Sequence, residues 1–174
     1  MMISAEAQKA DAAAKPMIGR WLQRKVRRVI QRDLELADLN LVDLKRKVQR
    51  EGLSGNATLG DGIGMTAGLL AQRFGISVVD ALAGRHLTSV QLADASDDLA
   101  KSTEAAGRLL NSQVQSARTT GHQMAFGAAA LGSLYRLLFI AQQGPPEFRS
   151  AAEMRASEWT RFIREMIEGP QDAG

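Results

Sequence analysis

Residues able to carry out chemistry are sparse in this chain. His86 and His122 are the only histidines, and neither has an HExxH motif or metal-ligand spacing around it. Cysteine is absent, which removes thiolate metal ligands, thiol nucleophiles and disulfides together. Asp97, Asp98 and Glu104 come closest to a set of paired carboxylates, but their spacing places them on the outer face of a periodic helix. We therefore expect no enzyme activity, no catalytic residue, no metal site and no cofactor.

A glycine-rich stretch offers a second place where chemistry is conceivable. Residues 60–66 read GDGIGMT and precede a helical pattern, and amides at the start of a helix can hold an anion. No strand precedes them, no Lys-Ser/Thr pair completes a P-loop, and Asp61 would repel a phosphate. The whole stretch 53–64 is instead expected to be a flexible loop that acts as a hinge.

Basic residues are concentrated near the N-terminus. Seven Lys/Arg lie between Lys15 and Arg32 with no acid among them, although the net charge of the chain is only +3. Apolar residues including Trp21 fall on one side of the same helical pattern, which predicts a basic amphipathic helix. Such a helix suits a protein partner or an anionic membrane surface, and nucleic acid less well. The candidate binding residues are Arg20, Trp21, Arg24, Lys25, Arg27, Arg28 and Arg32. The alternative is that Trp21 joins the core and the arginines are merely solvated.

A nucleic-acid interpretation has one further support. Residues 70–77, LAQRFGIS, resemble the first helix and turn of a helix-turn-helix. The segment that would read DNA, 78–83, is VVDALA and carries almost no side chain able to contact base edges. The resemblance fails at this segment, and an ordinary capped helical hairpin in the core is the favoured interpretation.

The most apolar part of the chain is the segment 122–143. Its core, 124–141, supplies 18 residues where a spanning helix needs about 20, and it contains Arg136 and two glycines. Small residues recur every fourth position, which allows close approach of another helix. We expect a buried core helix or an oligomer seam, with Gly127, Ala128 and Gly132 packed against another helix. Arg136 should face water or a carboxylate.

These segments together predict an all-α fold. It is an irregular bundle of about six helices around a central apolar helix, 124–143, with a basic amphipathic N-terminal helix. The expected organisation is a mobile arm at 1–15, the basic helical segment at 16–52, the glycine-rich loop at 53–64, the bundle at 65–169 and a tail at 170–174. Helix ends are expected at Gly75, Gly84, Gly121 and Gly144-Pro145-Pro146.

The sequence has no catalytic motif, and it has several amphipathic helical patterns. These two observations favour a non-catalytic protein. We expect helix-mediated protein–protein association, as an adaptor, assembly subunit or regulator that self-associates into a homo-oligomer. One alternative is a membrane-associating helical protein, such as an exported bacterial effector or pore-related factor; a second is a DNA-binding regulator. The N-terminus lacks the apolar core of a secretory signal, so a cytoplasmic location is expected. Export without a cleaved signal, or membrane association, is the alternative.

Overall fold

Every regular element of the described chain is a helix. The computed structural model describes residues 5–85 and 87–168, and it describes their side chains except those of 5–19, 21 and 51–58. The elements in chain order are α1 (Ala5–Phe74), α2 (Val78–Leu82), α3 (Ser89–Leu110), α4 (Gln115–Gln143) and α5 (Pro146–Glu168). The prediction of an all-α bundle is thereby confirmed. The first four residues and the expected tail, 170–174, lie outside the described residues.

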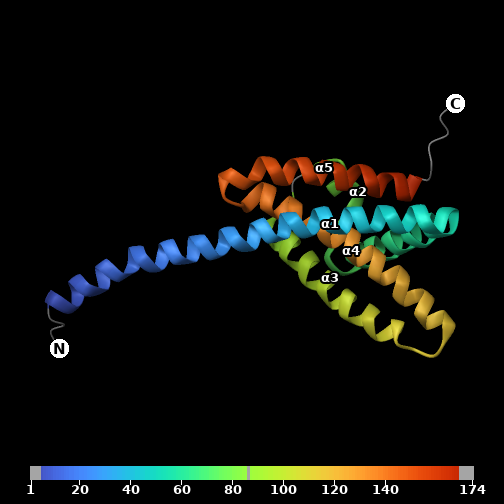
Figure 1. Cartoon of the computed structure of the whole chain (residues 1–174), viewed down its shortest axis with the longest axis horizontal. Helices are drawn as coiled ribbons and strands as arrows, with labels where there is room; N and C mark the ends of the chain where they lie inside the picture. The colour runs from blue at the N-terminus through green and yellow to red at the C-terminus, as the bar shows by residue number, and fades with distance from the viewer. Residues whose placement is uncertain (1–4, 86, 169–174) are drawn as a thin grey trace.

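The apolar helix α4 is the centre of the bundle. It packs against α1, α3 and α5, which lie around it in Figure 1. Leu131, Leu134 and Tyr135 are completely buried, and Trp159 and Ile163 of α5 are in the same core. Burial raises the pKa of Tyr135 above its ordinary value because the phenolate would lose its hydration. The prediction of a central apolar helix is confirmed.

Helix α1 contributes one face to this core. Between residues 30 and 44 its buried residues follow alternating steps of four and three, a spacing that keeps side chains on one side of a helix. They are Ile30, Leu34, Ala37, Leu41 and Leu44. An ion pair ties α1 to α5, since Arg155 donates from Nε and Nη2 to the two carboxylate oxygens of Asp38 at 2.9 and 3.0 Å. The bundle therefore holds residues 30–44 of α1, and it also holds the last part of this helix, where Leu59, Ile63 and Leu70 are buried.

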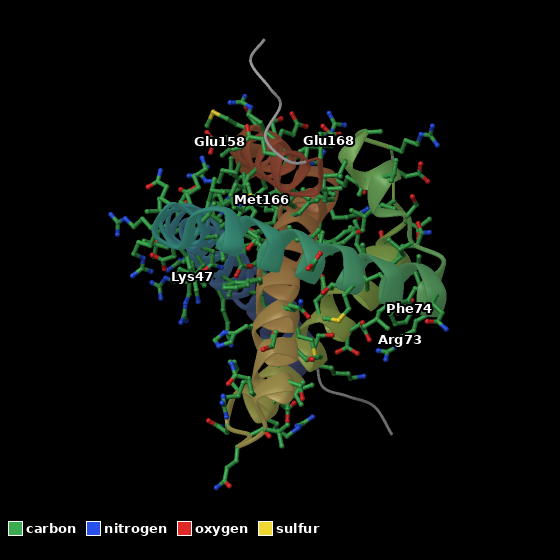
Figure 2. All side chains as sticks on the ribbon, turned by 90° about the vertical axis from the view of Figure 1, so that its right-hand side faces the viewer. Lys47, Arg73, Phe74, Glu158, Met166 and Glu168 are labelled. Carbon is green, nitrogen blue, oxygen red and sulfur yellow. The ribbon has the colours of Figure 1, made fainter. Side chains whose placement is uncertain are left out.

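The expectation of a loop at 53–64 is wrong, because α1 continues as a helix through these residues. The stretch instead contains a bend, so that the last part of α1 runs across α4 in a different direction from the first part (Figures 1 and 2). Its glycines allow neighbouring helices to come close. A Cβ on Gly60 would lie 2.7 Å from the carbonyl oxygen of Met166, and one on Gly62 would overlap the carbonyl oxygen of Gln123. Close packing, not chain flexibility, requires glycine at these two positions.

The boundary expected at Gly121 is also wrong. Helix α3 ends at Leu110 and α4 begins at Gln115, which leaves Gly121 inside α4. A Cβ at Gly121 would lie 3.0 Å from both the Leu109 Cβ and the Leu110 amide nitrogen. This glycine therefore lets the antiparallel helices α3 and α4 approach each other just after their turn.

The other predicted boundaries match the structure. Gly75 and Gly84 have positive φ angles of 65° and 75° at the ends of α1 and α2. Thr88 caps α3, since its hydroxyl accepts a bond from the Gln91 amide while the Gln91 side chain accepts one from the Thr88 amide. Gly144-Pro145-Pro146 separates α4 from α5. The expected end of the bundle at residue 169 lies outside the described residues.

Candidate binding surface

The N-terminal part of α1 extends beyond the other helices. Figure 1 shows it leaving the bundle as a long projection that ends at the N-terminus. The apolar side chains on its described part are uncovered: Leu22 is 48% exposed, Val26 49% and Val29 50%. The residue directly after Val29, Ile30, is buried. These three side chains, termed the uncovered stripe below, belong to the apolar side of the predicted amphipathic helix.

The basic residues predicted to bind a partner lie on the same part of α1 as this stripe. Arg20, Arg24, Arg27, Arg28 and Arg32 are all exposed. Arg27 pairs with Glu147 at the start of α5, with 2.9 Å between Nε and a carboxylate oxygen. Lys25 lines a hollow beside the stripe. The side chain of Trp21 lies outside the described residues. The structure thus places the basic residues on the projecting part of α1 and its junction with the bundle.

Beside the uncovered stripe, α1 and the end of α4 enclose an apolar hollow of about 360 Å³. The stripe forms one wall, and Phe139, Ile140 and Pro145 contribute to the other. Phe139 is 36% exposed, although it is a large aromatic residue. Contiguous exposed apolar surfaces are uncommon on monomeric soluble proteins, so this hollow is a candidate contact site.

Two further hollows follow the first along α1 and α4. Asp33 and Arg136 line both the first and the second hollow, and Ala129 lines both the second and the third. The three hollows therefore adjoin one another, and together they are termed the α1–α4 groove. It is lined by α1 residues between 22 and 50 and by α4 residues between 125 and 143, with Gly144 and Pro145 at one end.

Arg136 lies at the boundary between the first two hollows. Its Nε lies 3.5 Å from a carboxylate oxygen of Asp33, and its side chain is 52% exposed. The prediction that Arg136 faces water or a carboxylate is confirmed, since it does both. The pair joins α1 to α4 across the groove.

The small residues predicted to form a helix-packing seam have different surroundings. Gly127 lies where α1 and α4 cross, and a Cβ there would overlap the carbonyl oxygen of Gly62 and the hydroxyl of Thr66. The Thr66 hydroxyl donates to that same carbonyl at 2.8 Å. Ala128 is 3% exposed. Gly132 lines the second hollow, and a Cβ there would meet no atom within 4 Å. Gly127 thus packs against α1, whereas Gly132 opens into the groove.

The carboxylates considered for catalysis do not lie on one face as expected. Asp97 and Glu104 are exposed and pair along α3 with Lys101 and Arg108 at 3.2 and 3.1 Å. Asp98 is instead buried, a correction to the expectation of an outer-face position. Arg73 donates to it at 2.8 Å and joins the end of α1 to α3. The near-ideal charged hydrogen bond compensates the burial, which gives this pair a structural role.

No metal or anion site emerges from the other candidates. Within residues 5–85 and 87–168, no group of three or more metal-ligating side chains could hold a metal ion. His86 lies outside the described residues, whereas His122 is exposed with its ring 6.4 Å from that of Phe126. The glycine-rich residues 60–66 are inside α1, so they do not form a phosphate-binding loop before a helix. The segment compared with a DNA-reading helix, α2, has five residues.

Helix α4 is long and apolar enough to cross a bilayer by length and composition, and half of its most apolar window is buried. A membrane-spanning helix and the central helix of a bundle can both have the length and apolar composition of α4. Comparisons with protein-family models, with curated proteins and with solved structures find no match to this chain. The function must therefore be argued from the surfaces described above.

Proposed function

We propose that the protein is a non-catalytic adaptor or assembly subunit that binds another protein chain by helix packing. The observation that carries this proposal is the uncovered stripe, Leu22, Val26 and Val29, each about half exposed on a projecting helix. Burying such side chains contributes about 25 cal/mol per Å² of apolar surface. A helix that leaves these side chains uncovered while it buries the next residue, Ile30, is suited to a partner.

The test is whether association depends on the uncovered stripe. Light scattering should be used to compare the molar mass with the 18.8 kDa of one chain, so that the predicted self-association is measured directly. In parallel, an amphipathic helical peptide with a leucine stripe and uncharged glutamine flanks should be titrated against the full chain. We expect association in at least one of these assays.

Val26→Asp places a charge in the stripe and should weaken that association by about tenfold or more. Val90→Asp is the matched control, because Val90 is a 68% exposed valine on α3, away from the stripe. A monomer that binds no helical peptide would contradict the proposal. Equal effects of the two substitutions would show that the stripe is not the binding surface.

A membrane-associating function is the second candidate, and the composition of α4 favours it. The basic projecting helix would hold the protein at an anionic surface, while α4 would have to leave the core to enter lipid. Flotation with vesicles of neutral lipid, with and without phosphatidylserine, separates the two candidates. Salt-sensitive flotation without peptide binding supports the membrane function. A cytoplasmic location remains a prediction, as does its alternative of export without a cleaved signal.

A further inference from the structure

The α1–α4 groove is shaped to hold one helix. It follows α1 from residue 22 to residue 50, a distance of about 40 Å at the rise of an α-helix. Its walls include the large side chains Leu22, Val26 and Phe139, and its middle is lined by Ala129 and Gly132. Large residues at the walls and small residues on the floor are the arrangement in which an amphipathic helix places its apolar side into a groove.

Unlike Gly127, Gly132 is not used for packing within the chain. A Cβ added to Gly127 would collide with α1, whereas a Cβ added to Gly132 would meet no atom within 4 Å. The space at the middle of the groove is therefore open, and a helix can approach the α4 backbone closely at this point.

The charges around the groove indicate the chemistry of its occupant. Basic residues line both ends: Lys25 and Arg136 line the first hollow, and Arg46, Lys47 and Arg50 line the third. The two acids that line the groove are Asp33, which pairs with Arg136, and Asp43. The Lys47 ammonium lies 4.4 Å from the centre of the Phe126 ring, so a cation also stands beside the apolar floor. An acidic occupant gains from both ends of this groove.

A second copy and a flat bilayer fit less well. In an antiparallel pair of projecting helices, residues 18–32 of each copy would bring two basic segments together, a like-charge arrangement that opposes pairing. A bilayer would reach the exposed walls, but the floor lies between α1 and α4, where a narrow rod can enter more readily than a plane. Charge therefore disfavours one occupant, and shape disfavours the other.

We propose that the α1–α4 groove binds an acidic amphipathic helix supplied by a different protein. This inference rests on the proposed function and specifies its partner. The helix lays its apolar side on Leu22, Val26 and Phe139 and over Gly132. Its acidic flanks meet the basic residues at the two ends.

The experiment uses the full chain and three labelled helical peptides of about 25 residues. The peptides share one leucine stripe and differ in their flanking residues, which are glutamate, glutamine or lysine. Fluorescence anisotropy should show that the glutamate peptide binds about tenfold more tightly than the glutamine peptide, and the lysine peptide least tightly. Raising the salt concentration from about 50 mM to about 500 mM should reduce these differences, because the flanking charges are screened.

Two variants locate the binding. Gly132→Leu fills the floor and should lower the affinity for the glutamate peptide by about tenfold. Gly68→Leu is its matched control, since a Cβ on Gly68 also meets nothing within 4 Å, and it should leave the affinity unchanged. The double variant Arg46→Glu, Arg50→Glu should lower the affinity for the glutamate peptide and leave the affinity for the glutamine peptide unchanged. Circular dichroism confirms that each variant remains helical.

The remaining outcomes separate this inference from the proposed function. If the glutamate and glutamine peptides bind with equal affinity, the inference of an acidic partner is overturned, but the proposed helix-mediated association is still supported. A dimer of the chain that Gly132→Leu dissociates overturns it in favour of a second copy. A monomeric chain that floats with anionic vesicles and binds no peptide overturns both the inference and the proposed function.

Discussion

Gly127 and Gly62 lie where the central helix crosses the last part of α1. In Figure 2 this part of α1 runs across α4, between the labelled Lys47 and Phe74. Neither glycine can carry a Cβ without overlapping a backbone atom of the other helix. Because a carbonyl in a helix cannot move alone, an added methyl group would force the two helices apart.

Gly127→Ala is therefore expected to lower the free energy of unfolding by about 1–3 kcal/mol. Urea denaturation followed by circular dichroism measures this change. Gly132→Ala is the matched control on the same helix. A methyl group there has free space, and alanine favours a helix over glycine by roughly 0.5–1 kcal/mol, so this variant should be slightly more stable. Equal destabilisation of the two variants would contradict the crossing.

At the scale of elements, the most consequential feature is the continuity of α1 through its glycine-rich stretch. Replacing an exposed glycine by alanine should have a different effect on stability in a flexible loop than in a bent helix. In a helix, Gly64→Ala should raise the free energy of unfolding by roughly 0.5–1 kcal/mol, because a Cβ meets no atom and alanine restricts the unfolded chain.

Gly75→Ala should instead lower the stability by about 1–2 kcal/mol, because Gly75 has a φ of 65°. The same denaturation assay compares the two variants. A loop at 53–64 would leave Gly64→Ala without a stabilising effect, and that result would refute the continuous helix.

Glycine also explains how much of the architecture could be predicted from the sequence. Gly75 and Gly84 end helices as predicted, because a positive φ at a helix end is a local property. Gly60, Gly62 and Gly121 resemble them in sequence but lie inside helices, where they admit a neighbouring backbone. For Gly60 and Gly62 that neighbour is distant in the sequence, and for Gly121 it is α3, across a turn that the sequence pattern did not locate. The local pattern alone therefore assigns these glycines to loops.

The candidate site shows the same division. The amphipathic character of residues 16–32 is a local pattern, and the sequence was sufficient to select its basic residues. Which apolar residues stay uncovered depends on where α4 and α5 end. The buried Asp98 was misplaced for a similar reason, because its partner Arg73 belongs to another helix. Contacts between elements decide both questions.

At the scale of the whole molecule, the projection of α1 makes the protein elongated. Residues 5–29 span about 37 Å as a helix, and Figure 1 shows this part extending from the bundle. A compact chain of 174 residues has a radius of gyration of about 16 Å. Small-angle X-ray scattering of the free monomer should give a clearly larger value. A value near 16 Å would mean that the projection folds back onto the bundle.

The ion pair between Asp38 and Arg155 has a consequence for the order of synthesis. Its two residues are separated by 117 positions, so α1 can form this ion pair only after α5 has been synthesised. Until α4 and α5 emerge, the buried face of α1 lacks the two helices that it packs against most in the finished bundle. The nascent chain therefore presents a basic amphipathic helix with both its future core and its uncovered stripe exposed. Packing of α4 and α5 onto α1 distinguishes these two surfaces: one becomes interior, and the other stays exposed.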